Sequence, residues 1–594
     1  MHMTNTSALI PIVIGVTGHR NPHPDVIAIL EQKFTAVLEK IDCAAPNSPI
    51  VLLSPLAAGC DQIAARVALD FKRKKAGMRV ELVVPMPLAL DDYRLDFAND
   101  SGERTEFERL RALATFSFAL PPFKGALDAS GCISHQAMRN AHYRRLGLYV
   151  ALQSQLMVAM WDGESPKGVG GTGEIVAFCR GKLPIRNATL AVDASVDEWA
   201  RFAGTQIPSR PVTPLLSPES RTPHVVLFTP RAVSAASSNG SPERPDENER
   251  VFESICKQLR GELDPLNQAL GRASVQYQSD FCGAVNSPRW EAVVARFERL
   301  DALANRAKKI YLRDAGIIAL VAVLAICCFE FFSSFSVHWP VMVAYWGLLI
   351  LSLMWYKLSE RKRTEWIFVH SRGLAEAMRV QLGWAVAGIG ESVADHYVAR
   401  RGEELVSLRA QIRAASIELH SELVQSDDVS LKDSRTRWID NQARYFGEDS
   451  GGMKRRRAAD QRWSTCRAWG LRVSLCFSFI LGLAVFLMAK TGVPGTGGTS
   501  ELDELINWGC FIMGSLFALT VGIDYQRDVT LHREELEDAR RMSSIFARAQ
   551  ALLGAAKDAN TGEAILRAAG KEALDENAEW IVRHRGRLRA VDVG

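Results

Sequence analysis

GIIALVAVLAICCFEFFSSFSV, residues 316–337, is the stretch of sequence that decides how this chain is organised. Its run IIALVAVLAICCF has no polar face, whereas a helix in the core of a soluble protein usually keeps one. The stretch also meets the length of about 17–25 apolar residues that a helix needs to cross a bilayer. Three segments of the same kind follow it, at 341–358, 471–489 and 505–523. The sequence therefore predicts an all-α domain with four membrane-spanning helices, paired as two hairpins.

Lysine and arginine residues predict the orientation of these hairpins. They are concentrated before the first span, after the second, before the third and after the fourth, whereas the two connecting turns, 335–340 and 490–504, contain only Lys490. Because basic residues mark the cytoplasmic side of a span, we expect both termini in the cytoplasm. The basic runs at 360–363 and 454–457 fit this topology and contacts with anionic lipids, so we expect no nucleic-acid partner.

The two hairpins share one order of segments: a basic helix, two spans and an amphipathic helix. Four residues after the first hairpin recur at the same spacing after the second; they are His370, Leu374, Ala377 and Arg379, matched by His532, Leu536, Ala539 and Arg541. The pattern favours a duplicated module, in which functional elements commonly lie at the interface between the halves, although so short a match leaves coincidence open. Four spans are few for one pore, so we expect a homo-oligomer.

Glu330 is the one acidic residue well inside the predicted spans. A carboxylate is costly in hydrocarbon, and such residues usually face a bundle interior or water. The favoured interpretation places Glu330 near the outer end of its span, where it reaches the interface beside Ser333, Ser334 and His338. The other interpretation makes Glu330 a group that faces a pore.

The composition excludes several classes of protein. A length of 594 residues indicates several domains, and a net charge of +4 is too small for a chain that binds polyanions along its whole length. The 11 cysteines are scattered without a C-x-x-C motif, which suits a reducing cytosol and predicts neither a disulfide scaffold nor a metal site. The apolar segment 8–16 is too short to span a membrane and lacks the features of a signal peptide, so it predicts a buried first strand.

The first 230 residues alternate short strands with helices. Helical stretches such as 62–75 and 145–154 separate apolar runs that are rich in valine and isoleucine. These runs lie at 12–16, 50–53, 80–84, 155–160 and 225–228. Continuous apolar strands separated by helices indicate a parallel sheet that is covered on both faces. Ligands of such sheets bind beyond the carboxyl ends of the strands.

Glycine turns and helix starts follow these strand ends. Glycine lets a backbone approach a phosphate, and the N–H groups at the start of a helix favour an anion. Two such loops at one edge predict a site for a phosphorylated nucleotide. Its residues are Thr17, Gly18, His19 and Arg20 after the first strand; Ser54, Ala58, Gly59 and Asp61 after the second; Asp162 after the fourth; and Gly170, Gly171, Thr172 and Glu174 at a helix start.

Arg20 is the preferred ligand contact, because a cation at a strand-end turn has little structural purpose. Asp61 has two interpretations, a cap for its helix or a contact to a ribose hydroxyl. Tyr93 is a secondary candidate for stacking on a base. Arg139 and Asn140 lie just before a predicted helix and are further candidates for residues that reach the crevice. No grouping of residues predicts a catalytic triad, a metal site or a cofactor other than the nucleotide.

Five motifs carry a resemblance to a known family. They are GVTGHR (15–20), SPLAAGCDQIAARVAL (54–69), VVPMP (83–87), MVAMWDG (157–163) and GGTGEIVAF (170–178). Over roughly residues 10–230 the chain resembles the SLOG superfamily, which includes the cytokinin-activating LOG enzymes, DNA-processing protein A and nucleotide-sensing modules of bacterial defence systems. The repeated hairpins in 290–560 resemble the SLATT two-span effector module. The resemblance implies a Rossmann-like domain that binds a nucleotide second messenger and, through the spans, a membrane pore in antiviral defence.

The chain departs from the enzymatic branch of that superfamily. LOG-type hydrolases carry Pro-Gly-Gly-x-Gly-Thr-x-x-Glu, whereas residues 169–174 read VGGTGE, without the proline and with a different spacing to the glutamate. Glu174 and Asp162 are carboxylates that could act on a ribose, but neither stands at the matching position. The resemblance therefore implies binding without turnover. A membrane-tethered hydrolase of a nucleotide or NAD derivative, with the spans as an anchor, is the alternative, and a nucleotide-gated channel or transporter outside defence is a third.

The sequence is accordingly divided into six parts. The serine- and proline-rich segment 230–250 reads as a linker, which in this prediction passes a signal from the first domain to the spans. The parts are a SLOG-like nucleotide-binding domain (1–230), a linker and helix (231–285), the first hairpin with its flanking helices (286–380), a cytoplasmic helical region (381–450), the second hairpin with its flanking helices (451–560) and a C-terminal cytoplasmic helix (561–594).

Overall fold

The computed structural model describes residues 8–74, 79–99, 101–123, 126–128, 131–163, 168–180, 224–228, 245–275, 277–335, 339–396, 406–419, 431–491, 499–530 and 532–591. By its internal contacts the chain divides into two compact units. Unit 1 consists of Met1–Leu303, His370–Trp438 and Ala555–Gly594, and unit 2 consists of Ala304–Val369 and Ile439–Gly554. Each unit therefore combines segments that are far apart in the sequence.

Unit 1 is built around one parallel sheet. The strands are β1 (Ile12–Gly18), β2 (Ile50–Leu53), β3 (Val80–Met86), β4 (Phe116–Ala119), β5 (Leu156–Met160) and β6 (His224–Phe228), in the order β4-β3-β2-β1-β5-β6. Each neighbouring pair is parallel, so the parallel sheet predicted from the apolar runs is confirmed. The prediction missed β4, because its sequence Phe-Ser-Phe-Ala alternates apolar with small side chains and lacks a continuous apolar run.

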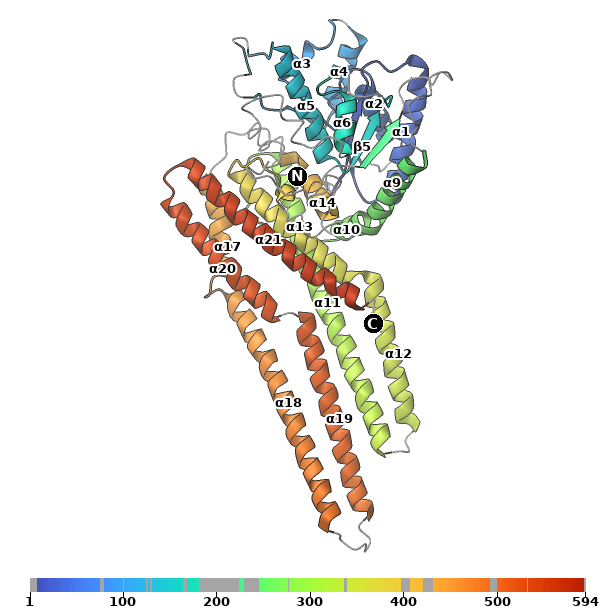
Figure 1. The fold of residues 1–594 in the computed structure, drawn as a ribbon, viewed down its shortest axis with the longest axis vertical. Helices are drawn as coiled ribbons and strands as arrows, with labels where there is room; N and C mark the ends of the chain where they lie inside the picture. Colours follow the sequence, from blue (N-terminus) through green and yellow to red (C-terminus); the bar gives the residue numbers. More distant parts are fainter. Residues whose placement is uncertain are drawn as a thin grey trace. The chain divides into compact units, whose positions relative to one another are not determined.

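Helices surround the sheet (Figure 1). α2 (Cys60–Lys74) contacts β1 and β3 and packs on α1 (Pro24–Ala44), while α5 (Gln136–Gln153) contacts the same strands and packs on α6 (Thr172–Cys179). The chain runs outward from β1 to β4, through α3 (Leu90–Arg94) and α4 (Gly102–Leu113), and returns to β5 on the other side of β1. Right-handed crossovers therefore place α2 and α5 on opposite faces of the sheet. This double coverage explains why all four residues of β2 and all five of β5 are buried.

Further helices complete unit 1. They are α9 (Pro245–Gln258), the π-helix η2 (Leu259–Leu263), α10 (Asp264–Gly271), the 3₁₀ turn η3 (Val393–Asp395), α14 (Val406–Ala415), α16 (Leu431–Ser434) and α21 (Ala559–Val591), together with the parts of α11, α13 and η5 (Arg435–Asp440) that belong to this unit. The linker predicted for residues 230–250 is wrong in its last part, since α9 begins at Pro245. Its residues before Pro245 lie outside those that the structure describes.

The C-terminal helix α21 is an integral part of unit 1. It packs on α13 (Thr364–Val386), where Asn577 donates a hydrogen bond to the Gly373 carbonyl over 2.9 Å. The indole N–H of Trp384 donates to the Leu566 carbonyl over 3.1 Å, and Trp384 is fully buried. The last segment of the chain thus contributes to the same packed unit as the first.

Unit 2 contains most of two helical hairpins. The first is formed by α11 (Pro288–Phe335) and α12 (Trp339–Lys362) and is followed by α13; the second is formed by α18 (Gly451–Thr491) and α19 (Thr499–Thr530) and is followed by α20 (His532–Ala555). Four helices of the described chain are long and apolar enough to cross a membrane. Only 0–17% of their apolar windows is buried within the chain. Their apolar surface is therefore not the core of this single chain, which agrees with helices that meet lipid.

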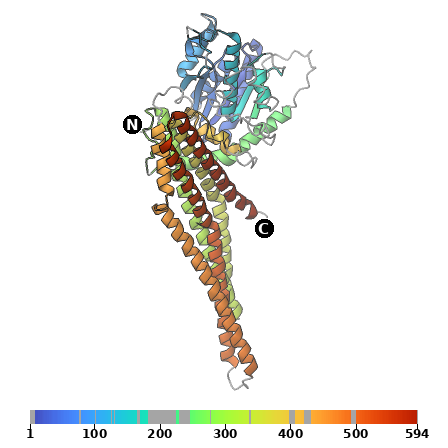
Figure 2. The same cartoon turned by 60° about the vertical axis from the view of Figure 1, so that its left-hand side comes forward.

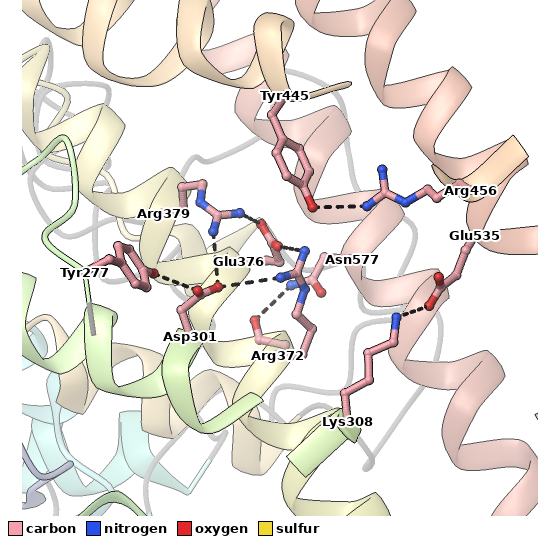
Figure 3. Close-up of polar contacts among 11 residues, drawn as sticks. Tyr277, Asp301, Lys308, Arg372, Glu376, Arg379, Tyr445, Arg456, Glu535 and Asn577 are labelled. Atoms are coloured by element: carbon pink, nitrogen blue, oxygen red, sulfur yellow. Dashed lines mark hydrogen bonds and ion pairs between the residues drawn. The ribbon is translucent and has the colours of Figure 1, made fainter. Parts of the chain in front are cut away.

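The helices before the first and third predicted spans are not separate from them. α11 runs unbroken for 48 residues and α18 for 41 residues, so each basic segment and the apolar segment after it form one helix. α18 and α19 lie side by side (Figures 1 and 2). Lys308 on α11 pairs with Glu535 on α20 over 2.6 Å, and the Tyr445 hydroxyl on α17 (Asn441–Phe446) accepts a hydrogen bond from Arg456 on α18 over 3.1 Å (Figure 3). The first contact links the two hairpins within unit 2, and the second holds α17 to the start of the second hairpin.

Candidate functional site

The carboxyl ends of β1 and β5 form the point at which the order of the sheet reverses. The chain leaves β1 toward β2 on one side and returns to β5 on the other, and a parallel sheet opens a crevice at such a point. His19 follows β1 and Asp162 follows β5, and the two are joined, with His19 Nε2 at 3.2 Å from Asp162 Oδ1. The backbone N–H of His19 also donates to the Met160 carbonyl over 3.3 Å. The sequence therefore predicted correctly that these two loops meet at one edge.

The loop between β2 and α2 packs directly on the loop after β1. Cys60 N–H donates to the His19 carbonyl over 3.1 Å. Gly59 has a φ of +85°, and a Cβ at this position would overlap the carbonyl group of Arg20. A Cβ on Gly18 would likewise overlap the side chain of Cys60. These two glycines were predicted to admit a phosphate, but the neighbour that requires them is the other loop of the protein.

Asp61 lies at the start of α2, beside the loop that follows β1. It is the second residue of α2 and only 7% exposed, and its Oδ1 has no hydrogen-bond partner among the described residues. Burial raises the pKa of Asp61 to about 7, against the opposing effects of Arg20 and of the backbone at Ala57. Ser54 is fully buried beside it, and its hydroxyl donates to the Asp61 carbonyl over 3.0 Å. The site thus holds a buried acid with unused hydrogen-bonding capacity.

Arg20 stands at the rim of this crevice. Its side chain is exposed, and the guanidinium lies 5.5 Å from the centre of the Tyr143 ring on α5. The next residue, Arg144, pairs with Glu174 of α6 over 2.6 Å. Through α5, therefore, the loop after β1 is connected to the loop before α6. Arg20 is the accessible cation that an anionic ligand would meet first.

The loop before α6 is closed by its own glutamate. Glu174 accepts a hydrogen bond from the Gly170 N–H over 2.6 Å, in addition to its pair with Arg144. Gly170 has a φ of +77°, and Gly171 precedes Thr172, the first residue of α6. With its carboxylate engaged on both oxygens, Glu174 holds the loop in place. It is not an unoccupied group that could attack a ribose.

The remaining predicted residues take varied places. Thr17 is the sixth residue of β1 and Ala58 is half-buried in the β2–α2 loop. Tyr93 is 1% exposed, and its hydroxyl donates to the Pro55 carbonyl over 3.2 Å. The prediction that it stacks on a base is therefore wrong, because its ring is enclosed by other aromatic side chains.

Arg139 and Asn140 lie inside α5 and not before it, since the helix begins nine residues earlier than predicted, at Gln136. Arg139 pairs with Asp92 and Asp96 and holds the segment around α3. The residues of α5 that do reach the crevice are Tyr143 and Arg144, which the sequence analysis missed.

The chemistry of the site favours binding. Burial raises the pKa of the Cys60 thiol to about 12, so no thiolate nucleophile is available there at neutral pH. In the part of the chain that the structure describes, no group of three or more His, Cys, Asp or Glu side chains could hold a metal ion. What the crevice offers is an exposed cation, a buried hydrogen-bond acceptor and close backbone turns.

Comparisons with known proteins do not identify this chain. No protein-family model matches it, and no curated protein matches its sequence.

Proposed function

We propose that this chain is a membrane-embedded receptor–effector. In this proposal the Rossmann-like sheet domain of unit 1 binds a nucleotide-derived signal at the crevice between β1 and β5, and the four apolar helices span the bacterial inner membrane and permeabilise it in response. The observation that carries the proposal is that an exposed cation, Arg20, and a buried acid, Asp61, whose Oδ1 has no hydrogen-bond partner among the described residues, lie at the same end of the sheet. The resemblance of the motifs to SLOG and SLATT modules supports a role in antiviral defence.

The two residues suit the two parts of a nucleotide. A guanidinium forms charge-assisted hydrogen bonds with phosphate oxygens, and Arg20 is accessible for them. A buried carboxylate without a donor costs free energy, which a ribose hydroxyl would recover by donating to Asp61 Oδ1. The crevice therefore fits a phosphorylated riboside better than an uncharged ligand.

In this proposal, α11 carries the signal, because it begins in unit 1 and continues without a break into the first apolar segment. Arg296 on α11 is 3% exposed, and its Nε–H donates to the Leu9 carbonyl over 2.9 Å. Its guanidinium also pairs with Glu418 over 3.0 Å and donates to the Ala415 carbonyl. Leu9 lies just before β1, whose other end carries His19 and Arg20. A shift of β1 on ligand binding would therefore pull on the helix that continues into the first apolar segment.

The helix that enters the first hairpin, α11, and the helix that follows it, α13, also contact each other within unit 1. Asp301 on α11 accepts a hydrogen bond from the Tyr277 hydroxyl over 2.6 Å and lies 3.6 Å from Arg372 and 3.4 Å from Arg379 on α13 (Figure 3). Glu376 pairs with both arginines. This cluster fixes the helix that enters the hairpin to the helix that leaves it. A signal that displaced α11 would act on both.

A membrane-tethered hydrolase is the second candidate. The raised pKa of Asp61, about 7, is the observation that favours it, because a carboxyl group with a pKa near the working pH is suited to general acid–base catalysis. The engagement of Glu174 by Arg144 and the Gly170 N–H argues for the receptor.

The test uses the full-length protein in lipid nanodiscs, because unit 1 includes segments from both ends of the chain. Thermal unfolding is followed with ADP-ribose derivatives and cyclic oligonucleotides, and dye release is followed from vesicles that contain the protein. We expect one ligand to raise the melting temperature and to trigger release, and Arg20→Ala to abolish both effects. Arg73→Ala is the matched control, since Arg73 is an exposed arginine on α2 that pairs only one turn away with Asp70.

Three other results would decide against the receptor. Release of free base or nicotinamide from the ligand would establish the hydrolase instead. Ligand binding without dye release would separate the crevice from the spans. Absence of any ligand effect across the panel would remove the nucleotide site.

A further inference from the structure

Glu330, the acid of the first apolar segment, lies between the two hairpins. Its Cγ, Cδ and Oε2 atoms occupy the place where a side chain on Gly514 of α19 would begin, so that any Cβ at Gly514 would overlap them. Glu330 is only partly exposed. The structure thus places the carboxyl group against the second hairpin, in a gap that only glycine leaves open.

This contact is one step of a continuous seam between α11 and α19. Small residues let the two helices approach closely, as is common between membrane helices, and aromatic rings close the far end. The contacts of this hairpin seam, in order along α11, are Gly316 with Gln526, Val323 with Gly522, Glu330 with Gly514, Phe331 with Phe511 (ring centres 5.4 Å apart) and Phe335 with Trp508 (4.7 Å).

The carboxyl group is inside the seam and not at its end. Glu330 lies five residues before the end of α11 at Phe335, which corresponds to about 7.5 Å along a helix axis. The Phe335–Trp508 contact stands between Glu330 and the helix ends. Glu330 thus lies within two helical turns of the end of α11, and its carboxyl group packs against α19.

Among the residues that the structure describes, no cationic side chain compensates this carboxylate. In the described part of the chain, neither a lysine, an arginine nor a histidine pairs with Glu330, and no cluster of further acidic or histidine side chains gathers there. An ionised carboxylate in hydrocarbon needs a cation or water. Ser334 lies one helical turn further along α11, on the same face of the helix as Glu330.

We propose that Glu330, at the hairpin seam, binds a monovalent alkali cation and makes the permeation path selective for cations. The proposal rests on the proposed membrane permeabilisation and deepens it. A single carboxylate with hydroxyl and water ligands suits Na⁺ or K⁺, whereas Ca²⁺ and Mg²⁺ take several carboxylate or carbonyl oxygens at once. Carboxylate rings are the usual source of cation selectivity in channels, and an oligomer would supply several copies of Glu330.

The first experiment does not depend on conduction. Full-length protein in phosphatidylethanolamine–phosphatidylglycerol nanodiscs is treated with dicyclohexylcarbodiimide, which labels carboxyl groups in apolar surroundings, and the modified peptides are quantified by mass spectrometry. We expect labelling at Glu330 in choline chloride and about tenfold slower labelling in NaCl or KCl at ten times the dissociation constant of the cation. Equal labelling in all three salts, or no labelling of Glu330, would overturn the cation site.

Two glycine variants test the geometry of the same site. Gly514→Ala forces the carboxyl group out of the seam, so protection by Na⁺ or K⁺ should be lost. Gly482→Ala, on α18 of the same hairpin, is the matched control, because nothing lies within 4 Å of a Cβ at that position. Protection that is retained in Gly514→Ala would show that the seam does not form the site.

The second experiment measures ion selectivity in planar bilayers in the presence of the activating ligand. We expect the K⁺/Cl⁻ permeability ratio to fall about tenfold in Glu330→Gln, as for the loss of one close charge in a low-dielectric path, and to be kept in Glu330→Asp. An unchanged ratio in Glu330→Gln would overturn the selectivity role while the proposed function stands. A wild-type protein that never conducts would remove the proposed function, and the carbodiimide result would still decide the cation site.

Discussion

The two edges of the sheet in unit 1 are built differently. At the amino edge, Asn267 binds both the N–H and the carbonyl of Ile10, and Arg296 binds the carbonyl of Leu9. At the carboxyl edge, Arg20 is exposed, and Asp61 Oδ1 lacks a hydrogen-bond partner among the described residues. Buried polar groups that are paired stabilise a fold, whereas unpaired ones cost free energy that a ligand can recover. The difference indicates that the polar groups at the amino edge are used within the fold, whereas the carboxyl edge keeps hydrogen-bonding capacity that the proposed ligand would use.

Arg296→Ala should produce the largest loss of stability. It leaves Glu418 without its cation and two backbone carbonyls without a donor, and breaking a buried pair in this way costs about 3–5 kcal/mol. The free energy of unfolding of the full-length protein in detergent is the measurement. Arg306→Ala, at an exposed position of the same helix, should change it by less than about 0.5 kcal/mol. Equal effects of the two variants would show that the amino edge is not held by Arg296.

Asp61→Asn should change the free energy of unfolding by an intermediate amount, and this change should depend on pH. Because burial raises the pKa of Asp61 from 3.8 to about 7, the folded protein keeps this proton to a higher pH than the unfolded chain. The contribution of protonated Asp61 to stability is therefore complete below about pH 4 and is lost as the pH rises to about 7. As the pH rises through this interval, the free energy of unfolding of Asp61→Asn should increase by about 2–4 kcal/mol relative to that of the wild type.

Unfolding of both proteins as a function of pH measures this gain. Asp70→Asn, at a partly exposed position of the same helix, is the control and should follow the wild type. A parallel pH dependence of Asp61→Asn and wild type would mean that Asp61 is already satisfied in the folded protein, and the contrast between the two edges would fail.

Arg20→Ala should have the smallest effect on stability and the clearest effect on ligand binding. The side chain is exposed and its only described contact is with the Tyr143 ring, so the free energy of unfolding should change by less than about 0.5 kcal/mol. Unfolding without ligand is the measurement. A loss as large as that of Arg296→Ala would make Arg20 a structural residue and would reverse the assignment of the carboxyl edge.

The sheet was predictable because its strands are covered on both faces. Burial on two sides requires a continuous apolar run, and the runs at 12–16 and 50–53 coincide with β1 and β2. β4 has the sheet edge on one side and carries Ser117 between two phenylalanines, so its run was too short to be seen. Local sequence thus identified the four interior strands and the edge strand β6, whose run is continuously apolar, and missed the edge strand β4.

The sequence could predict the site only for residues that directly follow a strand. The loops after β1 and β5 were expected to meet, and His19 and Asp162 do meet. The role of Gly59 depends on the Arg20 carbonyl, which belongs to another loop, and no local pattern reports such a contact. Tyr143 and Arg144 were missed because the start of α5 was predicted too late.

Tertiary packing across the chain was the least predictable feature. Glu330 could be recognised as an unusual residue, but Gly514 on the other hairpin supplies its environment. In the same way, the sequence of α21 has no signal for docking on Trp384. Contacts between segments separated by hundreds of residues leave no periodicity to read.

The docking of α21 has a consequence for biosynthesis. A ribosome makes the two hairpins before it makes Ala559–Val591, so unit 1 lacks its last helix while the apolar helices have already been synthesised. Until then Trp384 and the Gly373 carbonyl have no partner from α21. Completion of unit 1 therefore follows synthesis of the apolar helices, and a message truncated before residue 559 would release a chain that has these helices but lacks the last helix of unit 1.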